Sequence, residues 1–71
     1  MQFPMNSSVE NKILHAADET FLHLGFQGTT VDKIADTAGV NKAAIHYYFR
    51  SKENIYTLVF KNNLILLFDA L

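Results

Sequence analysis

The sequence has no cysteine, a single proline and only three glycines among its 71 residues. Without cysteine it can form neither a disulfide framework nor a thiolate metal site. Its first twelve residues, MQFPMNSSVENK, lack the basic, apolar and small-residue regions of a signal peptide. The longest apolar run, Leu64–Phe68, has five residues, whereas a membrane-spanning helix needs roughly 18. We therefore expect a cytoplasmic protein with no membrane partner.

The sequence has no large excess of either charge, since it contains six basic and seven acidic residues. The distribution is uneven: residues 1–40 carry two basic and five acidic residues, a net of −3, whereas residues 41–61 carry four basic and one acidic, a net of +3. The length allows one small domain, and the 49% hydrophobic fraction argues against disorder. The local positive stretch is typical of a small footprint for a defined anionic partner.

Apolar spacing predicts an all-α fold. Helices are expected over residues 9–24, 30–38, 42–49 and from 52 to the C-terminus, and no alternating run bounded by a hairpin turn indicates a strand. Residues 1–8 show no periodicity, so we expect a flexible N-terminal arm there. Nothing in the pattern suggests an internal repeat.

The first helix is predicted from a stripe of apolar residues at helical spacing: Ile13, Leu14, Ala17, Phe21, Leu22 and Leu24. Ser8 is a suitable N-cap for it. We expect Gly25 to adopt a left-handed conformation just past the helix, with Phe26 folding back onto Phe21.

Short polar residues and glycines mark the ends of the other helices. Thr29 or Thr30 is expected to cap the second helix, and Thr29 with Asp32 has the spacing of a capping box. The remaining ends are marked by Gly39 after the second helix, Asn41 before the third and Ser51 before the fourth.

Two short helices joined by a turn that contains glycine are the sequence form of a helix-turn-helix unit. Ala35 is small where the next helix would cross, and Gly39 can supply the positive φ of a tight turn. Val40 would fill the corner, while Ile45 and Tyr48 would bury the inner face of the third helix.

The third helix has two chemically different faces when its residues are placed at about 100° intervals. Its predicted inner face consists of Ile45, Tyr48 and Phe49, and its outer face of Lys42, Ala43, His46 and Tyr47. The outer face suits base edges: lysine can donate to guanine acceptors, imidazole can donate or accept, and alanine permits close approach or contact with a thymine methyl.

Other side chains suit the phosphate backbone. The hydroxyls of Tyr47 and Tyr48 can reach phosphates, as can Thr29 or Thr30 together with the backbone N–H groups that begin the second helix. Lys52, at the start of the fourth helix, can neutralise another phosphate.

Three strings at fixed separation carry a family resemblance: Thr29-Thr30-Val31-Asp32-Lys33-Ile34-Ala35, then Ala38-Gly39-Val40-Asn41-Lys42, then Tyr47-Tyr48-Phe49-Arg50-Ser51-Lys52-Glu53-Asn54. Over about residues 10 to 60 the chain resembles the N-terminal DNA-binding domain of TetR-type (tetracycline-repressor-like) transcriptional regulators. Three residues depart from the usual pattern: Asn41 stands where serine is commoner, Ala44 where a hydroxyl is frequent and His46 where tyrosine is usual.

The resemblance implies a three-helix helix-turn-helix DNA-binding domain over residues 9–50. Residues 51–71 would begin a fourth helix that leads to a ligand-binding and dimerisation domain absent from the chain. It also implies a homodimeric repressor that a small-molecule inducer releases from a palindromic operator on double-stranded DNA. The implied DNA contacts fall on Thr29, Thr30, Lys42, Ala43, Ala44, His46, Tyr47, Tyr48 and Lys52.

An alternative function is a small helical protein-interaction module that uses its apolar C-terminal helix as the working surface. Catalysis is not expected, because the sequence has no nucleophile near a base, no phosphate-cradling glycine loop and no paired carboxylates. No metal site or cofactor is expected either, since His15 and His23 lie eight residues apart and do not form an i, i+4 ligand pair. The apolar end from Leu64 to Leu71 suggests a fragment of a longer chain.

Overall fold

Every regular element in the computed structural model, which describes residues 8–69, is a helix. α1 spans Ser8–Gly28, α2 Val31–Ala38, α3 Lys42–Tyr48 and α4 Lys52–Asp69. The predicted all-α fold is therefore confirmed, and α3 and α4 begin at the predicted residues. The predicted N-terminal arm lies outside the described residues except for Ser8, which is the first residue of α1 rather than its cap.

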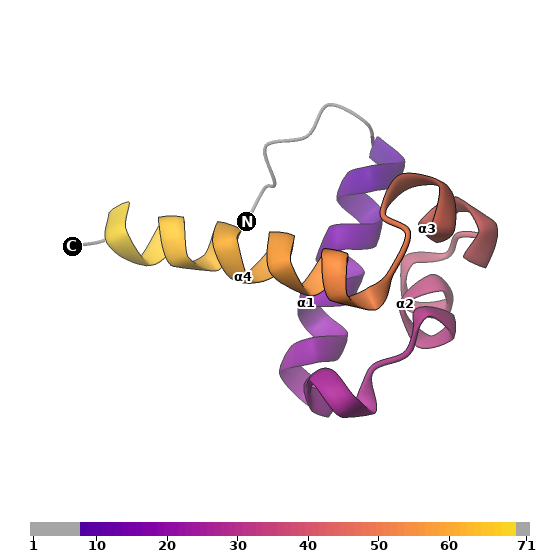
Figure 1. The fold of residues 1–71 in the computed structure, drawn as a ribbon, viewed down its shortest axis with the longest axis horizontal. Coiled ribbons are helices and arrows are strands. Elements are labelled where there is room, and N and C mark those ends of the chain that lie inside the picture. Colours follow the sequence, from indigo (N-terminus) through magenta and orange to yellow (C-terminus); the bar gives the residue numbers. More distant parts are fainter. Residues whose placement is uncertain (1–7, 70–71) are drawn as a thin grey trace.

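α1 is the element against which the others assemble. α2 and α4 both pack on it, and α3 is joined to the assembly through α2 and the core. Figure 1 shows α2 and α3 gathered on one side of α1, while α4 crosses α1 and extends beyond it on the other side. The two short helices thus sit at one end of the molecule, far from the end of α4.

The core is built from apolar residues of all four helices. α1 provides the longest contribution, and α2, α3 and α4 each add one or two side chains to the same cluster. Its buried members are Ile13, Leu14, Ala16, Ala17, Ile34, Ala35, Ile45, Phe49, Ile55 and Val59. Because seven or eight residues cannot form a stable helix alone, α2 and α3 depend on this cluster for their orientation.

Local hydrogen bonds mark the helix boundaries that the sequence predicted. Gly39 is left-handed, with φ 71° and ψ 34°, and its N–H donates to the Ala35 carbonyl at 2.9 Å. The Asn41 side chain accepts from the N–H of Ala43 at 2.8 Å, and the Ser51 hydroxyl accepts from the N–H of Asn54 at 3.1 Å. These three predicted end signals are confirmed.

The cap of α2 resolves an alternative that the sequence left open. Thr30 is the N-cap: it has extended backbone angles, and its hydroxyl oxygen accepts from the N–H of Lys33 at 3.1 Å. The predicted capping box of Thr29 with Asp32 is wrong, because Thr29 is fully buried and its hydroxyl donates to the Gly25 carbonyl at 2.8 Å.

α1 is longer than predicted because the chain makes another helical turn after Gly25. Gly25 has φ 73° and ψ 173°, so it has positive φ but is not in the left-handed helical region. The helix is kinked there and continues to Gly28 instead of ending at Leu24. The predicted return of Phe26 is confirmed: its ring stacks on that of Phe21 with centroids 6.0 Å apart.

Three apolar positions differ from their predicted burial, and one of them is Leu24, which is 48% exposed just before the kink of α1. Leu22 was expected to widen the stripe of α1, but it is 81% exposed because it lies on the side of α1 that no described helix covers. Tyr48 was expected on the inner face of α3, yet it is 39% exposed. Ile45 and Phe49 alone bury that face, and the Tyr48 ring lies at its edge against Tyr47 and Phe49.

α4 packs against the rest of the molecule mainly through the residues up to Asn63. Ile55 and Val59 are buried, and the amide of Asn63 donates to the Asp18 carboxylate of α1 at 3.2 Å. Beyond that contact, Leu64 to Phe68 are all 40–64% exposed, and Figure 1 shows this end of α4 projecting from the body. None of the helices within residues 8–69 combines the length and apolar character that crossing a bilayer demands.

The turn between α2 and α3 predicts how much two substitutions of Gly39 lower the free energy of unfolding. Replacing Gly39 with alanine should lower the free energy of unfolding by about 1 kcal/mol, because an L-residue resists its left-handed backbone. A β-carbon at Gly39 meets no atom within 4 Å, so the cost is conformational and not steric. Gly39→Asn, which tolerates this conformation, should lose less. Urea unfolding followed by circular dichroism measures both, and equal losses would contradict the backbone explanation.

Candidate nucleic-acid interface

The outer face of α3 is exposed, as the helical spacing predicted. Lys42, Ala43 and His46 are exposed, and Tyr47 is 78% exposed. On the opposite side of the same helix Ile45 is fully buried. Ala44 lies between the two faces and is half-buried. The core therefore holds α3 by one face and leaves a cation, a small residue, an imidazole and a phenol exposed on the other.

Lys42 is the cation of this face, and it is paired within the molecule. Its ammonium nitrogen lies 3.2 Å from the Oδ1 atom of Asp32 on α2. The Lys42 side chain is 54% exposed and that of Asp32 is 72% exposed, so water solvates the pair. The contact joins the beginning of α3 to the first turn of α2.

The aromatic and imidazole side chains of α3 also have neighbours within the molecule. The rings of Tyr47 and Tyr48 meet edge to face with centroids 5.0 Å apart, an arrangement that limits their rotation. The Nδ1 atom of His46 lies 3.4 Å from the Arg50 carbonyl oxygen. Arg50 itself has positive φ, 75°, in the reversal that leads from α3 to α4.

The two threonines before α2 have different environments. Thr30 is exposed at the N-terminus of α2, where the free N–H groups of the first turn attract anions. Thr29 is 0% exposed and its hydroxyl is used inside the fold. Thr30 is therefore available to a ligand at the surface, whereas the Thr29 side chain supports the turn beneath it.

Lysines from α2 and α4 bind backbone carbonyls in the last turn of α1. The Lys52 ammonium donates to the Phe26 carbonyl at 2.8 Å and lies 4.1 Å from the centre of the Phe26 ring. The Lys33 ammonium donates to the Gly28 carbonyl at 3.0 Å. Lys42 of α3 is linked to α2 through Asp32, the residue next to Lys33. We call Lys33, Lys42 and Lys52 the basic strip.

Sequence reasoning missed Lys33 as a member of this strip. A signal was present: Lys33 is a cation in the first turn of a helix, where the helix dipole disfavours positive charge. Lys52 has the corresponding place in the first turn of α4. In the structure Lys33 is exposed, so its charge remains accessible beside Thr30.

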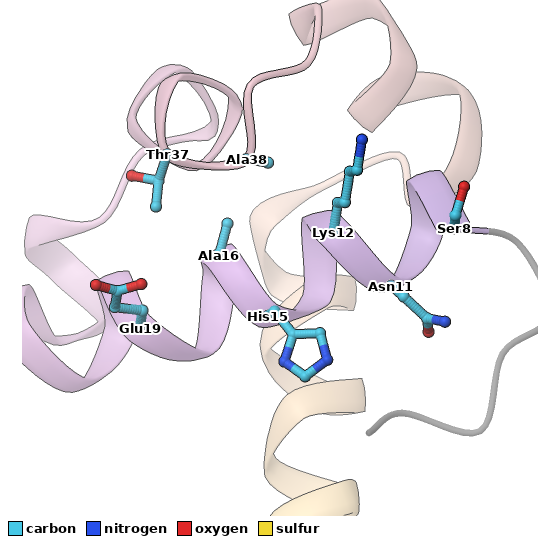
Figure 2. A pocket seen from close by; sticks show the side chains of 8 residues that line it. All are labelled: Ser8, Asn11, Lys12, His15, Ala16, Glu19, Thr37 and Ala38. Atoms are coloured by element: carbon cyan, nitrogen blue, oxygen red, sulfur yellow. The ribbon is translucent and has the colours of Figure 1, made fainter. Parts of the chain in front are cut away.

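A shallow hollow of about 400 Å³ lies between α1 and α2. Figure 2 shows that its polar side chains diverge: Lys12 points toward the α2 side, whereas His15 points away from it. Its lining residues are Ser8, Asn11, Lys12, His15, Ala16, Glu19, Thr37 and Ala38. Within residues 8–69 no three histidine, aspartate or glutamate side chains are close enough to hold a metal ion.

Comparison with known proteins identifies the arrangement. The family model described as "Bacterial regulatory proteins, tetR family" matches residues 13–59, which include all of α2 and α3. The chain belongs to the TetR family. The resemblance expected from the sequence is thus confirmed, and the TetR family consists of regulators, so the expectation that the chain is not an enzyme is confirmed as well.

Individual TetR-type relatives agree with this assignment. The chain is 46% identical over 55 residues to the HTH-type transcriptional regulator RutR of Escherichia coli K12, covering 78% of this chain and 26% of RutR. It is 40% identical over 48 residues to the negative regulator IcaR of the Staphylococcus aureus biofilm operon icaADBC (strain Newman), covering 68% of this chain and 26% of IcaR.

A solved structure, that of the hemolysin II transcriptional regulator HlyIIR, superposes with a TM-score of 0.72 at 45% identity. It covers 75% of this chain and 30% of HlyIIR. The chain thus spans about a quarter of the length of the curated relatives it matches. What it shares with them is the DNA-binding helix-turn-helix region of a TetR-type regulator.

The contacts of Lys52 predict a structural contribution from this lysine. Lys52→Gln should lower the free energy of unfolding by about 1–3 kcal/mol, because it removes a charge-assisted hydrogen bond and a cation–π contact. Lys61→Gln is the matched control: it changes an exposed lysine on the same helix and should stay within about 0.5 kcal/mol of the parent. Equal values in urea unfolding would show that Lys52 contributes nothing to the fold.

Substitutions of Thr29 and Thr30 should have different effects on stability and on DNA binding. Thr29→Val removes a buried hydroxyl and should cost about 1 kcal/mol of stability, with DNA affinity unchanged where the protein is folded. Thr30→Val removes the helix cap, which costs about 0.5–2 kcal/mol, and should also weaken DNA binding. Urea unfolding and duplex titration on the same samples separate the two. Weaker DNA binding by folded Thr29→Val would contradict the assignment.

Proposed function

We propose that this TetR-family chain binds a specific DNA sequence by placing α3 in the major groove. The observation that supports this most directly is the free polar face of α3, whose opposite face is held in the core. Lys42 would donate to guanine acceptors, Ala43 would meet a thymine methyl, and His46 would contact a base edge. Half-buried Ala44 would allow close approach of the helix to the groove.

The phosphate backbone would be held by groups on either side of α3. Thr30 and the first N–H groups of α2 would bind one phosphate. The hydroxyls of Tyr47 and Tyr48 would bind others, and the basic strip would add the positive charge of Lys33 and Lys52. The buried Thr29 would act only by supporting the turn before α2.

For the whole regulator we propose a homodimer in the cytoplasm that reads a palindromic operator. Two copies of the helix-turn-helix unit would then occupy half-sites about one helical turn of DNA, roughly 34 Å, or somewhat more apart. The exposed apolar end of α4 would pack against the larger domain that binds a small-molecule inducer, and inducer binding would move α4 and release the DNA. Repression is supported by IcaR, which is described as a negative regulator.

The alternative of a protein-interaction module draws support from one feature, the exposed apolar side chains from Leu64 to Phe68. The outer face of α3 argues against it, since a protein-binding face would favour apolar anchors over a lysine and an imidazole. Titration with random-sequence duplex at several salt concentrations separates the two functions. DNA binding predicts a linear fall of log affinity with log salt, whereas an interaction module would show no affinity for DNA at low salt.

The role of Lys42 is tested by its replacement with alanine. The variant should lose about 1–3 kcal/mol of discrimination at one base pair of a sequence selected from random duplexes. Single-base-pair variants of that duplex, titrated with parent and variant protein, locate the position. Lys61→Ala serves as the control, because it removes an equal charge from exposed α4. Equal losses by Lys42→Ala on selected and random duplexes would mean that Lys42 touches only phosphate.

A further inference from the structure

The ion pair between Asp32 and Lys42 contributes too little to stability for stability to be its main role. It connects the first turn of α2 with the first residue of α3 over 3.2 Å, and both side chains are more than half exposed. Ion pairs so well solvated add little to the free energy of folding. The two helices are in any case held by Ile34, Ala35 and Ile45 in the core. The pair therefore affects mainly the surface that α3 presents.

Asp32 changes the charge of that surface in a definite way. Asp32, Lys33 and Lys42 together carry one negative and two positive charges, a net of +1. Without the carboxylate the same group would carry +2. Asp32 also lies in the first turn of α2, where a phosphate bound by Thr30 would meet its negative charge. This carboxylate opposes phosphate binding at the edge of the interface.

The same contact leaves the Lys42 ammonium able to act on a base. An ammonium group has three N–H donors and no acceptor. One donor directed at Asp32 leaves two for the O6 and N7 acceptors of a guanine. The pair thus restricts where the lysine can reach while keeping its hydrogen-bonding capacity.

We propose that Asp32 is a specificity-determining residue that acts through Lys42, an inference that rests on the proposed DNA-binding function. Asp32 is an internal counterion: it positions the ammonium for a base edge and withholds it from the phosphates. Non-specific affinity arises almost entirely from phosphate neutralisation, whereas sequence discrimination comes from base contacts. Asp32 therefore lowers affinity for random DNA more than affinity for the operator.

The test compares Asp32→Asn with the parent on two probes, a random-sequence duplex and a duplex selected from a random pool by the parent protein. On the random duplex, Asp32→Asn should bind about five- to tenfold more tightly near 0.1 M salt, and its log–log salt slope should steepen by about 0.9 because Lys42 gains one phosphate. On the selected duplex the affinity should change by less than about twofold, since Lys42 is already engaged there. Asp32→Glu should retain the parent's ratio of affinities.

Two controls isolate the ion pair from charge alone. Asp36→Asn makes the same charge change at an exposed position one turn along α2. It should change the affinities for the random and the selected duplex by the same factor. In a Lys42→Gln background, Asp32→Asn should no longer steepen the salt slope. Circular dichroism of each variant confirms that the proteins compared are folded.

Two results would overturn the inference. If Asp32→Asn, like Asp36→Asn, changed the affinities for the two duplexes by the same factor, Asp32 would act only as a diffuse charge. If Asp32→Asn steepened the slope equally with and without Lys42, the residue would not act through that lysine. A parent protein without salt-dependent DNA binding would refute the proposed function itself, and that result is visible before any variant is made.

Discussion

The structure depends on the burial of one face of a seven-residue helix. α3 is too short to be stable alone, so its orientation comes from Ile45 and Phe49, which lie in the core. Asn41 caps its beginning, and the left-handed Gly39 sets the turn that leads to it. As long as that face is buried, the opposite face must point away from the molecule. The proposed base-reading surface is a consequence of this packing.

The helices on either side of α3 in the sequence, α2 and α4, are also held to α1 by hydrogen bonds to its backbone carbonyls. The carbonyls of Phe26 and Gly28 accept from Lys52 and Lys33, so the last turn of α1 binds cations from two other helices. A lysine that hydrogen-bonds a carbonyl still has donors and its full charge. The same side chains therefore stabilise the fold and carry the positive charge that the proposed function assigns to phosphate binding.

α4 joins two different environments. Its first half belongs to the helix-turn-helix unit through Ile55 and Val59, whereas the side chains from Leu64 to Phe68 are exposed. This division matches the comparisons, in which the family model ends at residue 59 and the chain spans about a quarter of its relatives. Under the proposed function, a shift of α4 would act on α1 at two places, on Phe26 through Lys52 and on Asp18 through Asn63.

Periodicity and end signals determined the helices, their order and most of the core. Gly39, Asn41 and Ser51 were predictable because a cap depends on a few neighbouring residues, and the outer face of α3 was predictable because helical geometry separates residues around one axis. The family followed from the same strings. Tertiary structure alone decided that Thr30 and not Thr29 lies at the surface, and that Leu22 and much of Tyr48 are exposed. It also decided that Lys42 meets Asp32 and Lys52 meets Phe26. Those outcomes depend on which element packs beside each side chain, and local spacing contains no information about a neighbour that is distant in the sequence.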